Sequence, residues 1–155
     1  MKLPIKSFDI RTAQQFLDNL VREACDDAQG DQLSSRAAIA AAIFCWHLQD
    51  WVWAEHKTTL TARLCLSTKD DLVQYLLVNC PEFEVIQGIA NGSKHFHSQQ
   101  KEPTSTAMGW AIFGTLALWS YTALTVEFKG NTVKFLDVLR ACLKYWDTLF
   151  QEYLQ

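Results

Sequence analysis

The chain has 155 residues, of which 49% are hydrophobic and 20% charged, with a net charge of −3 and a pI near 5.7. A chain of this length can bury a real core, so we expect residues 1–155 to form a single domain, and the composition excludes a disordered protein. The acidic balance excludes nucleic-acid binding through overall positive charge, so that any contact with RNA needs a local patch or a second subunit.

The cysteines and the longest uncharged segment indicate in which cellular compartment the protein is expected. The five cysteines stand at 25, 45, 65, 80 and 142, with an odd count and no CxxC pair, which is typical of reduced, buried thiols. The N-terminal residues lack the apolar run of a signal peptide, and we expect a cytoplasmic protein. Residues 103–126 carry no charge and could cross a bilayer by length, but their five threonines and two glycines favour a buried segment without membrane contact.

The first predicted elements are two long helices. Asp9 can cap a helix with an i, i+4 apolar stripe, and Gly30 is a plausible end for it. Ser34 or Ser35 then caps a second helix that runs to about Lys57. The first half of this second helix, AAIAAAIFCW, is apolar almost all round, which indicates a helix buried at the centre of a bundle.

Two shorter helices follow. Residues 70–79 predict a third helix, and Pro81 suits the first turn of a fourth that runs to about His97. Beyond a polar loop the pattern becomes ambiguous, and we favour a strand over a helix for residues 110–120.

The hydrophobic period changes near the C-terminus. Apolar and polar residues alternate over 124–128 and 132–135 around Gly130-Asn131, which predicts a hairpin turning at these two residues because both tolerate a positive φ. The last helix carries an apolar face wide enough to pack on the bundle and the hairpin, or on a partner subunit. The sequence therefore predicts a mainly α fold: a four-to-five-helix bundle with a small C-terminal β-hairpin or three-stranded meander before the last helix.

Five polar residues on two of the predicted helices form the candidate site. His47 and Asp50 share a face of the second helix within a Trp-rich apolar run, where a histidine and a carboxylate are costly unless they are paired. Asn91 and His95 share a face of the fourth helix, with Lys94 adjacent. We expect the two polar faces to meet, with Asp50 accepting a hydrogen bond from His47, His95 or Lys94.

Three interpretations of this cluster stay open. It can be a structural polar network that fixes helix register, a catalytic or ligand-binding site, or a metal site with ligands from His47, Asp50 and His95. No HxxxH pair shares a helix face, and the sequence contains no GxSxG turn and no glycine-rich phosphate loop. We therefore predict neither a metal nor a cofactor.

The run Ala90-Asn91-Gly92-Ser93-Lys94-His95 resembles the signature of the HEPN superfamily, whose members are small helical domains that include toxin, antiphage and RNA-processing endoribonucleases. That signature is an arginine, a polar residue, three variable residues and a histidine on a late helix, often faced by an acidic residue of an earlier helix. Asn91 and His95 match it, and Asp50 suits the acidic position. Ala90 stands in the arginine position, which leaves the adjacent Lys94 as the cation.

The resemblance implies metal-independent RNA cleavage at a site shared by a homodimer. His95 would act as general acid or base, Asn91 would hold the phosphate, Lys94 would stabilise negative charge, and Asp50 and His47 would support them. The chain is also similar to uncharacterised bacterial and phage helical proteins, which imply no activity. Two alternatives remain: a non-catalytic module that binds a protein partner, and a helical-bundle metal-binding protein.

Overall fold

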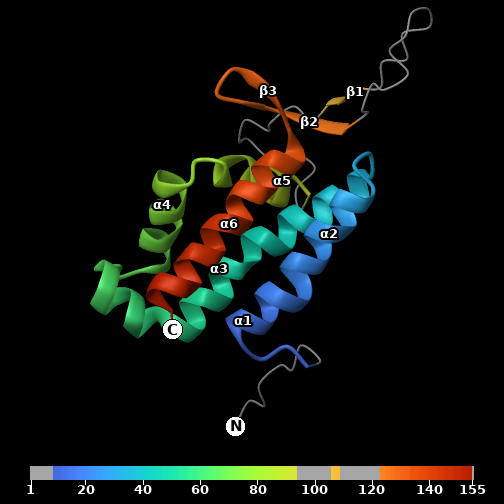
Figure 1. The fold of residues 1–155 in the computed structure, drawn as a ribbon. Coiled ribbons are helices and arrows are strands. Elements are labelled where there is room, and N and C mark those ends of the chain that lie inside the picture. Colours follow the sequence, from blue (N-terminus) through green and yellow to red (C-terminus); the bar gives the residue numbers. More distant parts are fainter. Residues whose placement is uncertain (1–8, 94–105, 109–122, 155) are drawn as a thin grey trace, which may run out of the picture.

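The structure is a computed structural model that describes residues 9–93, 106–108 and 123–154 (Figure 1). Its first helical rod joins α1 (Ala13–Phe16), the π-helical segment η1 (Leu17–Arg22) and α2 (Glu23–Gly30). The rod begins later than predicted, because Thr12 and not Asp9 is its N-cap: the Thr12 Oγ1 accepts a hydrogen bond from the Gln15 amide at 3.1 Å. It ends at Gly30, as the sequence predicts.

The central helix is α3 (Ser35–Leu64), which packs against the first rod, α4, α5 and α6. Ser34 caps it, since its hydroxyl accepts from the Ala37 amide at 3.2 Å. The helix continues to Leu64, past the end predicted near Lys57, and stops where Cys65 adopts a left-handed conformation with φ 57°. The extension matters for the site because α4 is thereby placed beside the middle of α3.

Two short helices follow α3. Helix α4 (Lys69–Asn79) agrees with the prediction and begins with a capping box, in which Thr68 and Asp71 exchange side-chain and backbone hydrogen bonds. Helix α5 (Phe83–Gly92) begins just after Pro81 but ends at Gly92, before the predicted end near His97.

A three-stranded antiparallel sheet precedes the last helix, in the order β1 (Thr106–Met108), β2 (Ala123–Phe128) and β3 (Asn131–Lys134). The predicted hairpin is present, but its turn lies one residue earlier than expected. Phe128 pairs with Asn131, so the turn residues are Lys129 and Gly130, with φ 51° and 78°. The strand favoured for residues 110–120 lies outside the described residues.

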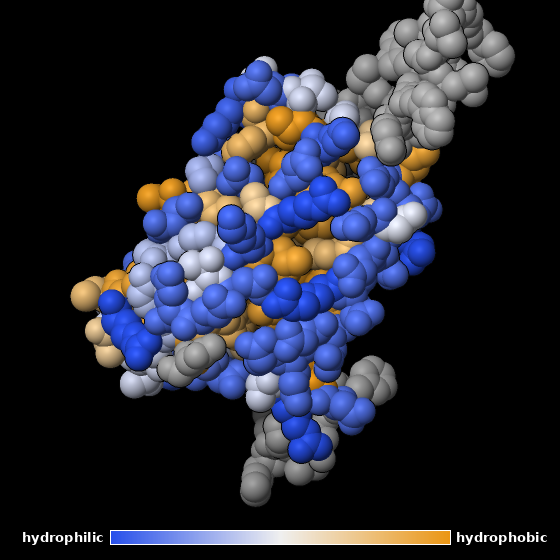
Figure 2. Space-filling model, in the orientation of Figure 1, coloured by the Kyte–Doolittle hydropathy of each residue, from blue (hydrophilic) through white to orange (hydrophobic). Residues whose placement is uncertain are grey.

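Helix α6 (Phe135–Tyr153) lies across α3 and closes the bundle (Figure 1). Its apolar face is buried within the chain itself: the buried residues are Phe135, Leu136, Val138, Leu139, Cys142, Trp146, Leu149 and Phe150. This face therefore gives no support to a partner subunit. On the side shown in Figure 2, hydrophilic side chains dominate, and hydrophobic surface shows between them and in small patches at the edges of the view.

The fold class agrees with the sequence prediction, since the described residues form a mainly helical bundle with a small antiparallel sheet before the last helix. None of the helices in the described ranges combines the length and the apolar character that crossing a membrane requires.

Candidate functional site

Asp50 lies on the outer side of α3, and its partner comes from α4. Its carboxylate forms an ion pair with the Lys69 ammonium, and both side chains are nearly half exposed, at 47% and 44%. The sequence led us to expect a partner on α3 itself or on the fourth helix. The capping box that starts α4 at Thr68 presents Lys69 in the first helical turn, and this placement brings the ammonium to Asp50.

His47 is half-buried on the same helix, three residues before Asp50. It follows Trp46, whose ring packs against Phe83 with centroids 6.4 Å apart. Because Phe83 is the first residue of α5, the middle of α3 lies beside the beginning of α5.

Asn91 lies at the other end of α5. Ile89, two residues earlier, shares a hollow with Ser35 and Ile39 in the first turns of α3, so α5 runs antiparallel to α3. Ile39 and His47 are separated by eight residues, which is about 12 Å along a helix. Two residues correspond to about 200° of helical rotation, so Asn91 projects from the side of α5 opposite to Ile89. The two helices pack together as expected, with the end of α5 beside the start of α3.

Lys94 and His95, the other two predicted site residues, lie outside the described residues. Ala90, which occupies the arginine position of the HEPN signature, is buried in the core with no exposed surface. That position of α5 therefore faces the interior, where a charged side chain could not reach a bound phosphate without leaving the core.

In the metal-site interpretation of the sequence, the ligands would be His47, Asp50 and His95. Among the described residues, no three or more histidine, cysteine, aspartate or glutamate side chains are arranged to hold an ion. Asp50 is engaged with Lys69, and His95 is not described.

Four of the five cysteines are buried, and the exposed one is Cys65. Burial raises the pKa of the Cys25 thiol to about 12, with the nearby Cys45 thiol as a smaller cause. Burial also strongly raises the pKa of Cys142, which shares hydrogen bonds with the Cys45 and Cys80 thiols. With their raised pKa values, Cys25 and Cys142 stay protonated near neutral pH, and a protonated buried thiol is neither a nucleophile nor a metal ligand.

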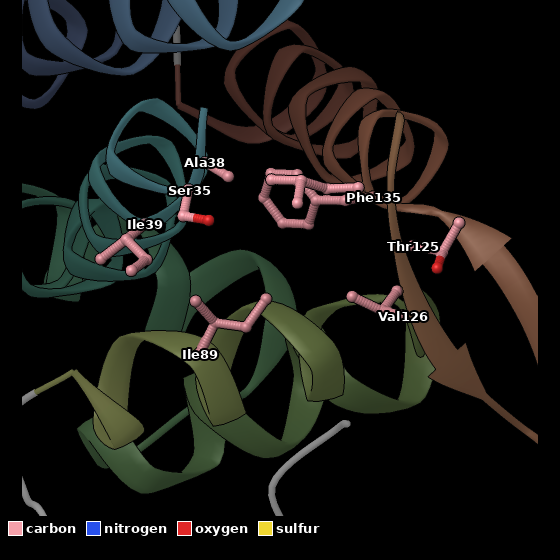
Figure 3. A pocket seen from close by; sticks show the side chains of 8 residues that line it. Ser35, Ala38, Ile39, Ile89, Thr125, Val126 and Phe135 are labelled. Atoms are coloured by element: carbon pink, nitrogen blue, oxygen red, sulfur yellow. The ribbon is translucent and has the colours of Figure 1, made fainter. Parts of the chain in front are cut away.

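The structure contains a feature that the sequence analysis did not identify, an apolar hollow that we call the α3/β2 groove. Its walls come from the start of α3, the end of α5, strand β2 and the start of α6 (Figure 3). The lining residues are Ser35, Ala38, Ile39, Ile89, Leu124, Thr125, Val126 and Phe135. In Figure 3, Ile89 lies on one side, Ser35 and Ile39 on the second and Val126 and Phe135 on the third, so three layers of the fold meet there.

The groove is small and open on one side, with a volume of about 70 Å³. Pockets for drug-sized ligands typically have roughly 300–1,000 Å³, so this one suits a single aliphatic side chain better than a small-molecule ligand. Ile39 on its wall is 39% exposed, although the apolar run that contains it predicts a helix buried all round. The excess of apolar residues on α3 was thus the sequence signal for the groove.

Comparison of the chain with protein-family models, with curated proteins and with solved structures gave no match.

Proposed function

We propose that this protein is a non-catalytic interaction module that binds an aliphatic side chain of a protein partner in the α3/β2 groove. The observation that carries the proposal is the groove itself, an open hollow whose walls are apolar apart from Ser35 and Thr125. Ile39 on the wall of the hollow is 39% exposed, so apolar surface continues from the groove onto the exterior of α3.

The size of the groove sets the scale of the interaction. Burying one aliphatic side chain contributes roughly 1.5–3 kcal/mol, which is too little for a stable complex by itself. The groove is therefore the anchor point of a larger contact, in which surrounding residues exclude water from the anchor. Ile39 and Leu33 are exposed at 39% and 46% near the start of α3 and extend the apolar surface in that direction.

The predicted catalytic arrangement has less support. Asp50 is paired with Lys69, and Ala90, at the arginine position of the HEPN signature, is buried. A site for RNA cleavage needs its acid, base and phosphate-binding groups within reach of one phosphodiester.

A filled groove tests the proposal. In Figure 3 the Ser35 hydroxyl points toward the hollow, so that a Ser35→Leu side chain would occupy it without disturbing the core. Peptides that bind the full wild-type chain are selected from a displayed library of amphipathic peptides. The affinities of the selected peptides are then measured for the wild type and for Ser35→Leu. Thr58→Leu, another exposed position of α3, is the matched control.

We expect Ser35→Leu to weaken peptide binding at least tenfold and Thr58→Leu to leave it unchanged. Selected peptides that bind the wild type and Ser35→Leu equally well, or a selection that yields no binder, would contradict the proposal.

One observation favours a second candidate, a HEPN-like endoribonuclease that acts on RNA as a homodimer. Asn91 is only partly buried at the end of α5, and the sequence continues directly to Lys94 and His95. Purified protein and a His95→Ala variant are incubated with total RNA, with and without a chelator. Cleavage that survives chelation and is lost in the variant supports this candidate, whereas intact RNA in every reaction rejects it.

A further inference from the structure

Another hollow lies at the opposite end of α3, and we call it the α3/α4 hollow. It is wide and open, with a volume of about 410 Å³. Thirty residues of α3, about 45 Å along its axis, separate this hollow from the α3/β2 groove, so the two surfaces are distinct. Its walls come from the chain just after α3 and from one side of α4, at Cys65, Leu66, Asp71, Gln74, Tyr75 and Val78.

Asp71 is the one charged residue among the described residues that line this hollow. Its Oδ2 accepts hydrogen bonds from the Thr68 and Ser67 amides at 2.8 and 2.9 Å, and these bonds hold the pKa of the carboxyl below its ordinary value. The carboxylate is therefore ionised at neutral pH, and its charge is not cancelled because both donors are neutral. Within the described residues Oδ1 accepts no hydrogen bond, so a cation can pair with Asp71 without breaking the capping box.

The cations on the adjoining turns of α3 and α4 are directed elsewhere. Lys69 forms its ion pair with Asp50. Arg63 keeps its charge, but its Nη1 donates to the backbone carbonyls of Glu152 and Tyr153 at the end of α6, at 3.1 and 3.3 Å. Neither cation lines the hollow. In the part of the chain that the structure describes, Asp71 thus has no cationic partner.

Apolar surface lies on the same side of α4 as Asp71. Val78 is 75% exposed, the highest value among the large hydrophobic residues in the described ranges. It follows Asp71 by seven residues, or almost two turns, so both lie on one side of the helix about 10 Å apart along its axis. Tyr75 lies between them, with its hydroxyl beside that of Tyr145 of α6. A ligand along this side meets a carboxylate at one end and an aliphatic side chain at the other.

We propose that the α3/α4 hollow binds an extended segment of a protein partner, with an arginine at Asp71 and an aliphatic side chain at Val78. Three residues of extended chain span about 10 Å, so the two side chains stand three positions apart. Arginine suits the site better than lysine, because its planar guanidinium can donate to Asp71 and to the exposed Gln74 amide and can stack on the Tyr75 ring. This inference goes beyond the proposed function and does not depend on the α3/β2 groove.

A set of short peptides tests the inference. The reference peptide has blocked ends and the sequence arginine-alanine-alanine-leucine. One altered peptide carries citrulline, the uncharged isostere of arginine, and another carries serine in place of leucine. Each is titrated into the full ¹⁵N-labelled chain, and dissociation constants are obtained from backbone amide chemical shifts.

Two variants of the protein complete the design. Asp71→Asn removes the charge but keeps an oxygen that can accept from the Ser67 and Thr68 amides. Asp70→Asn is the matched control, because it makes the same change of charge at the adjacent exposed carboxylate, which does not line the hollow.

We expect the reference peptide to shift amides of α4 and to bind at least threefold more tightly than either altered peptide. Asp71→Asn should weaken its binding at least threefold, Asp70→Asn should not, and 0.5 M salt should reduce the preference for arginine over citrulline. Equal binding of the arginine and citrulline peptides would overturn the inference, as would equal effects of the two variants. An unchanged affinity of the serine peptide would remove the contact with Val78, and the absence of shifts in α4 would remove the site altogether.

Discussion

The indole Nε1 of Trp146 donates a hydrogen bond to the backbone carbonyl of Cys45 at 3.1 Å, within the buried contact between α6 and α3. The same indole packs edge-on against Phe83 of α5, with centroids 5.5 Å apart and an interplanar angle of 75°. One side chain thus joins three helices that lie far apart in the sequence. The same three helices, α3, α5 and α6, also contribute residues to the α3/β2 groove.

Replacing Trp146 tests that role. We expect Trp146→Phe to lower the free energy of unfolding by about 2 kcal/mol, because it removes a buried hydrogen bond and leaves unfilled volume. The measurement is urea unfolding followed by circular dichroism. Trp53→Phe, at a partly exposed position of α3, is the control and should cost clearly less. Equal losses in the two variants would show that Trp146 has no special role.

Much of the helical framework could be predicted because its signals are local. Ser34 precedes an apolar run and caps α3, and the boundaries of α4 agree with the pattern of residues 70–79 to within one residue. The errors arise where several residues of similar chemistry compete. Thr12 displaces Asp9 as the first cap, and the turn falls on Lys129-Gly130 because strand pairing, and not turn propensity alone, sets the register.

The candidate site was less predictable because it depends on how helices pack. Helical spacing predicts that His47 and Asp50 share a face of α3, but it does not reveal which helix lies beside that face. Lys69 reaches Asp50 because α4 lies beside α3, and Ile89 faces the start of α3 because α5 runs antiparallel to it. The groove also combines four elements that are distant in sequence, so the apolar excess on α3 indicates one of its walls but not the groove as a whole.

The Asp50–Lys69 ion pair is expected to be weak. Both side chains are nearly half exposed, and solvent-exposed pairs contribute about 0.2–1 kcal/mol. A double-mutant cycle with Asp50→Ala and Lys69→Ala, measured by urea unfolding, should give a coupling energy below about 1 kcal/mol that shrinks further in 0.5 M salt. A coupling well above this value would show that Asp50 is a structural element of the bundle and not a surface charge.

The burial of four thiols predicts their reactivity. In the native protein one thiol, Cys65, should react rapidly with a chromogenic disulfide reagent, because it is exposed while Cys25, Cys45, Cys80 and Cys142 are buried. The other four should react only when the protein unfolds in urea. Cys65→Ser should remove the rapid phase and leave the slow phase unchanged. Two or more rapidly reacting thiols in the native wild type would contradict the buried arrangement.

The raised thiol pKa also predicts a dependence of stability on pH. Burial raises the pKa of Cys25 from an ordinary value of 9.0 to about 12. Below pH 9 the thiol is protonated in both the folded and unfolded states, and its contribution to stability is fully present. Between about pH 9 and 12 the unfolded state ionises first and binds fewer protons, so the free energy of unfolding falls as pH rises.

Urea midpoints measured between pH 7 and 10.5 check this trend. The midpoint should fall above pH 9, and the fall should be shallower in Cys25→Ala, which lacks the titrating group. Burial of Tyr145 raises the pKa of its phenol in the same direction, so some of the decline should remain in the variant. Curves that run parallel in the wild type and Cys25→Ala would contradict the assignment to Cys25.

The turn of the β2–β3 hairpin places two residues in left-handed conformations, at φ 51° for Lys129 and 78° for Gly130. Glycine adopts such a φ without strain, whereas lysine does so at a cost that asparagine partly avoids. We expect Gly130→Ala to lower the free energy of unfolding by about 1 kcal/mol and Lys129→Asn to raise it by a few tenths. A Cβ at residue 130 would meet no other atom within 4 Å, so a loss of stability in Gly130→Ala must come from backbone strain and not from a clash. Urea unfolding of these variants and of a third, Asn131→Val, distinguishes this turn from the Gly130-Asn131 turn that the sequence suggests. Asn131→Val changes a β3 position and should be tolerated in the observed register. If residues 130 and 131 formed the turn, Asn131→Val should be the most damaging of the three changes.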